Sequence, residues 1–201
     1  MAAWFPSGLA LIEQMVRIGV RSIPIVAIVQ VFIGVILALQ LAPTLADYGQ
    51  LERVADVVGI AMIRELGPLL TAIVLSGFAG ASIAAELGAM VESEEIKALR
   101  AHALHPIRFL VVPRFLATTI MIVALAVMAD FIGVLGGFLA AVLVLDVPPW
   151  LYINLTQTAL KTTDFLTGLV KAGVFGAVIS MIACYEGLGV RGGPEGVALD
   201  P

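Results

Sequence analysis

The sequence predicts an all-α fold: a polytopic bundle of four membrane helices within a single domain, residues 1–201. Composition is the first observation, because 61% of the residues are hydrophobic and 13% are charged. Soluble domains are about half apolar and a quarter charged. The second observation is a set of apolar runs as long as the roughly 20 residues that cross a hydrocarbon core of about 30 Å. Charged residues gather between these runs, so they bound the spans.

Residues 1–21 predict an amphipathic helix at the membrane surface. Apolar side chains recur at helical spacing from Trp4 to Val16, and such a segment lies among the headgroups with its apolar face inward. A plain leader into the first span fits equally well. Arg17 and Arg21 follow the short apolar stretch instead of preceding it, which argues against a cleaved signal.

The first span is predicted at 22–46, which holds no charged residue, and Pro43 is expected to kink or end it. A stripe of mixed polarity lies along one side at spacings of three, four and seven residues. From the residues alone, packing in a core and facing lipid are equally good interpretations. The stripe consists of Leu37, Gln40, Leu41, Thr44, Leu45 and Tyr48.

The second span is predicted at 65–90, after a connection at 47–64. Its second half consists mostly of small residues, which let helix backbones approach closely in lipid, so we expect it inside the bundle. Arg64 and Glu65 at its start are either an interfacial anchor or a site. Glu86 near its end is a candidate for gating or headgroup handling, because an ionisable group at membrane depth is costly; simple contact with headgroup water is the alternative.

The third span is predicted at 109–145 as one long helix, because two crossings would need about 40 residues. Asp130 interrupts it. This residue is either an internal polar contact or the level at which the helix leaves the bilayer, and we expect the second. A bend is expected near Gly133, Gly136 and Gly137. The fourth span is predicted at 165–185, after a mixed loop at 146–164 that can hold a short surface helix, and 186–201 form a tail.

Lys and Arg near the span ends predict the orientation. Two crossings separate the basic N-terminal segment from the basic connection after span two, so both fall on one side of the membrane. The positive-inside rule makes that side, and the N-terminus, cytoplasmic. The residues concerned are Arg17, Arg21, Lys97, Arg100, Arg108 and Arg114.

The charged connection predicts a short amphipathic helix at 93–104. Ser93 suits the N-cap, and Glu94 and Glu95 place negative charge where the helix dipole favours it. Ile96 and Leu99 then share one face with Ala103, and Pro106 stops the helix. A solvated turn that only enforces topology is the alternative, but it needs no apolar stripe, so we expect a docking helix.

No enzyme is expected in this chain. It lacks the phosphate-binding loop G-x-x-x-x-G-K-[ST], so any ATP would be hydrolysed on another subunit. His102 and His105 have no evident carboxylate or cysteine partner, so no metal site is predicted. An intramembrane enzyme would need paired acids or a nucleophile and base at matched depth, and Asp130 and Glu86 lie at different depths. No nucleic-acid partner is expected.

Several linked stretches resemble the MlaE/YrbE-type permeases, the membrane subunits of MCE-associated ABC transporters of phospholipids or related lipids. The longest is RELGPLLTAIVLSGFAGASIAAELGAMVESEEIKAL, residues 64–99. HPIRFLVVPRFLA at 105–117 and YEGLGVRGGPEGV at 185–197 resemble two further family segments. The resemblance covers roughly residues 20–197.

The resemblance implies a bacterial inner-membrane permease subunit that works as a homodimer with an ABC ATPase and an MCE-domain partner. ATP and Mg²⁺ would bind the ATPase, and this chain would hold no cofactor. The segment Ser93–Leu99 would be the coupling helix, with Ser93, Glu94, Glu95, Ile96 and Leu99 on the ATPase. The first span, with its stripe from Leu37 to Tyr48, would line the lipid pathway at the dimer interface, and Glu86 would belong to the same pathway.

The sequence departs from the family pattern at three places. Phe78 stands where the family has Arg, and His105 where it has Asp before PIR. The family usually continues into a fifth span, whereas Val197 is followed here by Ala198 to Pro201, so four spans are expected. An inactive or truncated scaffold subunit is therefore the alternative function.

Overall fold

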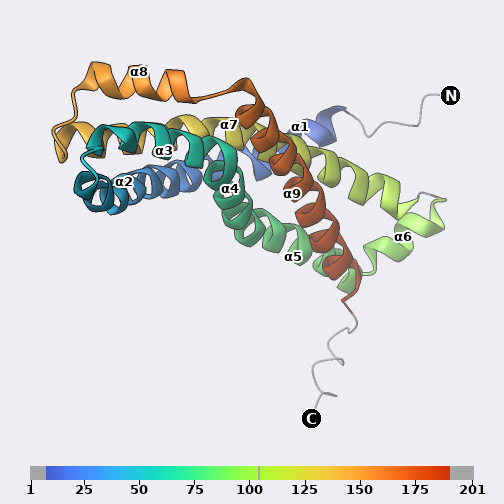
Figure 1. Ribbon diagram of the computed structural model, residues 1–201. Helices are drawn as coiled ribbons and strands as arrows, with labels where there is room; N and C mark the ends of the chain where they lie inside the picture. The colour runs from blue at the N-terminus through green and yellow to red at the C-terminus, as the bar shows by residue number, and fades with distance from the viewer. Residues whose placement is uncertain (1–7, 104, 191–201) are drawn as a thin grey trace, which may run out of the picture.

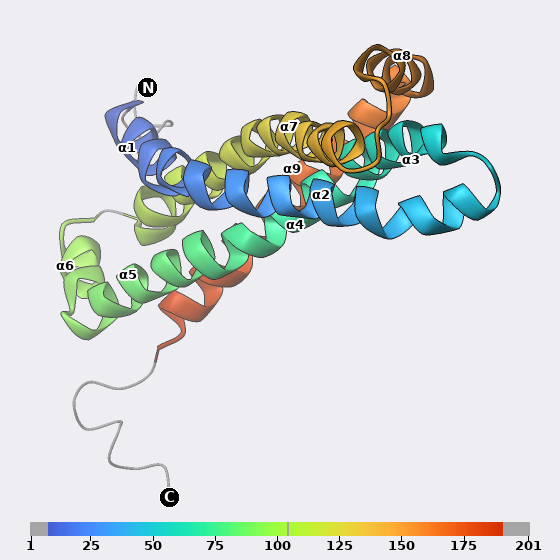
Figure 2. The ribbon, with the colours of Figure 1, turned by 90° about the vertical axis from the view of Figure 1, so that its left-hand side faces the viewer.

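The computed structural model describes residues 8–103 and 105–190, and every regular element among them is helical. The all-α membrane bundle is confirmed, because four helical stretches are long and apolar enough to cross a membrane. They are Leu11–Asp47, Leu51–Glu92, Ile107–Leu143 and Thr162–Leu188. Figures 1 and 2 show an elongated bundle with helix α6 at one end and helix α8 at the other. We call these the α6 end and the α8 end.

The first stretch contains α1 (Gly8–Ile18), the 3₁₀ turn η1 (Val20–Ser22) and α2 (Ile23–Asp47). The predicted segment 1–21 is thus a separate helix followed by a tight turn, and its residues 1–7 lie outside the described part. Pro43 does not end the first span, since α2 continues to Asp47. Its ring sits on an exposed side of the helix, where the missing hydrogen bond is tolerated.

The second stretch begins much earlier than predicted, at Leu51 instead of 65. The segment 47–64 was expected to be a connection because it is rich in charge. It is helical because Val54 and Val58 are fully buried on one side, while Arg53 and Asp56 neutralise each other one turn apart at 3.0 Å. Its elements are η2 (Leu51–Arg53), α3 (Val54–Ala61), the π-helical η3 (Met62–Leu66), α4 (Gly67–Leu75), the π-helical η4 (Ser76–Gly80) and α5 (Ala81–Glu92).

The remaining elements follow the predicted order. The π-helical η5 (Ile107–Val111) and α7 (Val112–Leu143) form the third span, and α9 (Thr162–Leu188) forms the fourth. Helix α7 runs without a break through the glycines at which a bend was expected. Between the spans lies α8 (Pro149–Ala159), whose Tyr152 packs edge-on against Phe138 with ring centroids 5.4 Å apart. Burial there raises the pKa of Tyr152 to about 12.

Small residues set how closely the spans pack. Added Cβ atoms on Gly34 of α2 would meet the backbone of Gly133 and Gly137 of α7, and a Cβ on Gly187 of α9 would meet the backbone of Ala84. Close backbone approach of this kind replaces the hydrophobic driving force that lipid cannot supply. The small-residue half of span two is only partly inside the bundle, because one side of it is buried and the opposite side is exposed. The buried residues are Ala79, Gly80 and Gly88, and the exposed ones are Gly77, Ala81, Ala85 and Ala89.

Candidate functional site

The α6 end is built around helix α6 (Glu95–Ala101), which follows α5 after a two-residue turn. This helix is shorter than the predicted 93–104, and residue 104 lies outside the described part. Ser93 is not its N-cap as predicted, because it is the C-cap of α5, where its backbone N–H donates to the Ala89 carbonyl at 2.9 Å. Glu94 takes the N-cap position in a left-handed conformation, with φ of 59°. This reversal of the backbone separates α5 from α6 and turns α6 away from the axis of α5.

The acidic start of α6 is stabilised by its own lysine. The ammonium of Lys97 donates to Glu94 Oε1 at 2.7 Å. This hydrogen bond, with the attraction of the same charge, holds the pKa of Glu94 below its ordinary value. Glu95 lies in the first turn and is exposed. Both carboxylates therefore reach solvent at the tip of the molecule.

The apolar side of α6 packs on the chain itself. Ile96 and Leu99 are half-buried against the main core cluster. A cavity of about 640 Å³ lies beside them, lined by Ile96, Lys97, Arg100 and apolar residues from α5 and α9. The exposed residues of α6 are Glu95, Lys97, Ala98, Arg100 and Ala101, of which Lys97 and Arg100 also line this cavity. The predicted stripe thus holds the helix in place, and the polar side faces outward.

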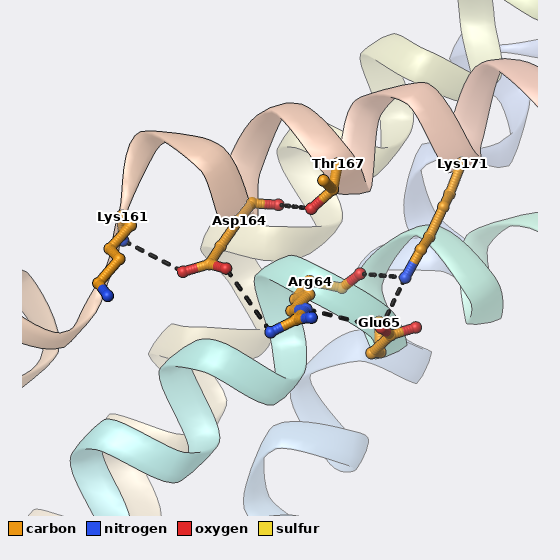
Figure 3. Close-up of polar contacts among 6 residues, drawn as sticks. All are labelled: Arg64, Glu65, Lys161, Asp164, Thr167 and Lys171. Atoms are coloured by element: carbon orange, nitrogen blue, oxygen red, sulfur yellow. Dashed lines mark hydrogen bonds and ion pairs between the residues drawn. The ribbon is translucent and has the colours of Figure 1, made fainter.

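Toward the α8 end, span two and span four are joined by charged groups, which Figure 3 shows. Lys171 Nζ lies 2.6 Å from Glu65 Oε1, and Arg64 Nη1 lies 3.9 Å from Asp164 Oδ1. The Lys171 ammonium also donates to the Arg64 carbonyl at 3.3 Å. Pro68 has no N–H to give to that carbonyl, so the lysine supplies a donor that the helix cannot. Arg64 and Glu65 therefore each pair across to α9.

A wide cavity of about 1600 Å³ opens at the α8 end. Its walls combine apolar side chains such as Leu45, Leu51 and Leu155 with charged ones such as Arg64 and Asp164. A space of mixed polarity suits an amphipathic ligand better than a purely polar or purely apolar one.

The predicted stripe on the first span divides between two environments. Leu37, Leu41 and Leu45 are half-buried and pack against a core cluster around Ala38 and Ala42. The other three members, Gln40, Thr44 and Tyr48, are exposed. Of the six residues, Leu45 lines the wide cavity. The stripe is therefore partly core and partly surface.

Glu86 lies toward the α6 end, where two arginines share its carboxylate. Its Oε1 lies 2.9 Å from Arg17 Nη1 and 3.2 Å from Arg114 Nη2. Its side chain is 23% exposed. The Glu86 carboxylate therefore pairs with two arginines and does not contact headgroup water alone.

Asp130 is an internal residue, so the expectation that it marks the level where the helix leaves the bilayer is wrong. Asp130 is 3% exposed, and a Cβ added to Gly67 would clash with its Oδ1. Gln30, also fully buried, donates to the Gly67 carbonyl at 3.3 Å. The glycine thus admits two polar side chains from α2 and α7 to α4. Within the described residues, Asp130 Oδ1 and Gln30 Oε1 have no hydrogen-bond partner.

Comparison with known proteins identifies the family. Residues 11–200 match the family model described as Permease MlaE. The chain belongs to the MlaE permease family. A probable ABC transporter permease protein of Rickettsia felis is 41% identical over 187 residues, covering 93% of this chain and 72% of that protein. The intermembrane phospholipid transport system permease protein MlaE of Haemophilus influenzae is 32% identical, over 94% of this chain and 72% of that protein.

A plant relative shows how far the likeness extends. The chloroplastic protein TRIGALACTOSYLDIACYLGLYCEROL 1 of Arabidopsis thaliana is 31% identical over 186 residues, which cover 92% of this chain and 53% of that protein. The family model and the bacterial relatives confirm the resemblance to the MlaE/YrbE-type permeases.

Sequence reasoning missed two of the four charged residues that join span two to span four, Lys171 and Asp164. The signal was present, because spans two and four carry opposite charges at the same end: Arg64 and Glu65 on one, Asp164 and Lys171 on the other. The sequence alone does not show that the two helices are neighbours. Ion pairs in a membrane span face the protein interior or a water-filled cavity, and Arg64 and Asp164 line the wide cavity.

Proposed function

We propose that this chain is the membrane permease subunit of an ABC transporter that moves phospholipids or related lipids. The observation that carries the proposal is its membership of the MlaE family, in which a relative 32% identical is named as an intermembrane phospholipid transport permease. The transport runs between the inner membrane and an MCE-domain partner in the periplasm. The chain is a multi-pass protein whose N-terminus and α6 lie in the cytoplasm.

The orientation rests on the basic residues of the α6 end. Arg17, Arg21, Lys97 and Arg100 lie near span ends there, and such residues favour the cytoplasmic side. The α8 end then faces the periplasm, where its wide cavity of mixed polarity offers a lipid a place for both tail and headgroup. The MCE-domain partner meets the chain at this end.

ATP hydrolysis belongs to a separate ATPase subunit, which carries the nucleotide and Mg²⁺. Helix α6 is the contact with that subunit. Its exposed polar side is free to bind, while Ile96 and Leu99 hold it to the bundle, so force on α6 reaches α5. Closure of the ATPase pair would move α6 and reshape the lipid pathway at the interface between two copies of the chain.

A homodimer is supported by two exposed surfaces. The small residues Gly77, Ala81 and Ala85 form an open face on span two, and no atom lies within 4 Å of a Cβ placed on Gly77. Such faces let a second backbone come close. Gln40, Thr44 and Tyr48 are exposed on the first span, and in a dimer they would line the lipid pathway together with Leu37, Leu41 and Leu45.

The test is capture of the cognate ABC ATPase by the detergent-solubilised chain, followed by mass spectrometry of the bound lipid. Arg100→Glu reverses an exposed charge of α6, and Arg21→Glu is the matched control, at an exposed arginine outside α6. We expect the native chain and Arg21→Glu to capture the ATPase and retain phospholipid, and Arg100→Glu to lose the ATPase.

Other outcomes separate the alternatives. Capture of the ATPase without bound lipid and without ATP-dependent lipid movement would indicate a scaffold subunit. Equal capture by all three chains would remove α6 as the contact. No capture by the native chain would overturn the proposal.

A further inference from the structure

One carboxylate joins three elements that are far apart in the sequence. Glu86 of α5 pairs with Arg17 of α1 at 2.9 Å and with Arg114 of α7 at 3.2 Å. Both arginines use the same oxygen, Oε1. Figure 2 shows that α1, α5 and the start of α7 gather toward the α6 end of the bundle.

The two arginines differ in burial, so the two links differ in kind. The Arg114 side chain is 4% exposed, and its Nη1 donates to the Leu110 carbonyl at 2.8 Å. A buried guanidinium that loses its counter-ion is strongly destabilising, so Arg114 fixes Glu86 to α7. The Arg17 side chain is 41% exposed. An ion pair open to solvent is weak and can break and re-form without leaving a buried charge unpaired.

The position of the weaker link matters for transport. Helix α5 leads into α6 through the turn at Ser93 and Glu94, so any movement of α6 reaches Glu86 along α5. Helix α1 leads through η1 into α2, and the far end of α2 contributes Leu45 and Ala46 to the wide cavity. The Arg17–Glu86 pair therefore connects the segment proposed to meet the ATPase with the helix that borders the cavity.

We propose that the Arg17–Glu86 pair is a coupling link, through which movement of α6 and α5 is passed to α1 and α2 during lipid transport, with Arg114 as its fixed anchor on α7. This inference rests on the proposed function. Arg17 and Glu86 are positioning residues here, because they act on the lipid through the helices that they join. Coupling of this kind requires an element with two arrangements, and the solvent-exposed Arg17 contact provides one.

The experiment reconstitutes the chain with its cognate ATPase in proteoliposomes and measures two rates on the same sample. These are ATP hydrolysis and ATP-dependent movement of nitrobenzoxadiazole-labelled phosphatidylethanolamine. The variant is Arg17→Gln, which leaves the buried Glu86–Arg114 pair intact. The matched control is Arg21→Gln, which removes an exposed positive charge four residues further on. Arg17→Lys tests rescue by another cation.

We expect Arg17→Gln to bind the ATPase and hydrolyse ATP at the native rate, with lipid moved per ATP reduced about threefold to fivefold, the size of a partly exposed ion pair. Arg21→Gln should keep the native ratio, and Arg17→Lys should restore most of it. A purely structural role would lower both rates together and leave the ratio unchanged, and that result overturns the inference.

Failure of the two proposals gives different results. If the native complex moves lipid and Arg17→Gln moves as much per ATP, the coupling link is wrong and the proposed function stands. If the native chain binds no ATPase or moves no lipid, the proposed function fails and the coupling link fails with it.

Discussion

Placing a methyl group on Gly34 should destabilise the bundle, because α2 and α7 touch there through their backbones. A Cβ at this position would collide with the Gly133 carbonyl and lie 2.8 Å from the Gly137 nitrogen. Carbon contacts are most favourable at about 3.5–4.0 Å. Neither obstacle is a side chain that can rotate away, so the two helices must separate.

The magnitude follows from two opposing terms. Alanine gains about 1 kcal/mol over glycine in helix propensity, whereas forcing an extra group into a packed interior costs about 1–3 kcal/mol or more. Contact with two backbone groups puts Gly34→Ala at the upper end of that cost, so we expect a net loss of about 1–2 kcal/mol in unfolding free energy. Gly173→Ala in α9 is the matched control, because the nearest atom to its Cβ position is Val123 Cγ2 at an ordinary 3.7 Å, and it should be neutral or stabilising.

The assay is reversible unfolding of the detergent-solubilised chain by sodium dodecyl sulfate, followed by circular dichroism. The informative quantity is the difference between the two glycine variants, because the propensity gain is common to both. Equal stability of Gly34→Ala and Gly173→Ala would refute the close approach of α2 and α7.

Three further predictions concern charged groups. Glu65→Lys and Lys171→Glu should each lower the unfolding free energy by about 0.5–1 kcal/mol, since the side chains of Glu65 and Lys171 are 56% and 37% exposed. The double exchange should recover most of this loss in the same sodium dodecyl sulfate titration. Additive losses would contradict the pairing. Lys97 lowers the pKa of Glu94, so the contribution of the ionised Glu94 to the order of α6 is present above the ordinary carboxyl pKa and is lost as pH falls through the lowered value. At pH 7, the amides of α6 should therefore exchange faster in Glu94→Gln than in the native chain. Equal exchange would argue against this contribution. Asp130→Asn should leave thermal stability unchanged or raise it, because a buried carboxylate oxygen without a hydrogen-bond partner is unfavourable. A loss of more than about 2 kcal/mol in unfolding free energy would indicate a required hydrogen bond to the acid.

The four spans within residues 8–103 and 105–190 and their order could be predicted from the sequence, because they depend on composition over about 20 residues. The start of span two could not be predicted. Charge at Arg53 and Asp56 resembles a loop, and only the structure reveals that the two groups neutralise each other along a helix whose other side buries Val54. Local charge is a poor boundary signal where a helix projects beyond the hydrocarbon core.

The candidate site divides in the same way. The short helix after span two follows from its own pattern of Ile96 and Leu99, which the structure places against the core. The prediction that Ser93 caps α6 was wrong because the next residue, Glu94, adopts a left-handed conformation. No periodicity in the sequence indicates such a conformation. The partners of Glu65 and Glu86 come from helices distant in the chain, so they depend on which helices are neighbours.

The π-helical turns of span two constrain how this chain can change in evolution. Each inserts about one residue beyond the α-helical count, and one residue rotates everything that follows by roughly 100° about the helix axis. Two such turns, Met62–Leu66 and Ser76–Gly80, precede Glu86. Deleting a single residue within either would remove the extra residue and leave Glu86 facing the arginines, whereas the same deletion in the α-helical segment Gly67–Leu75 would swing Glu86 away from both. Substitutions there can be absorbed one contact at a time, but a one-codon deletion in an α-helical segment re-aims every later residue of the span at once.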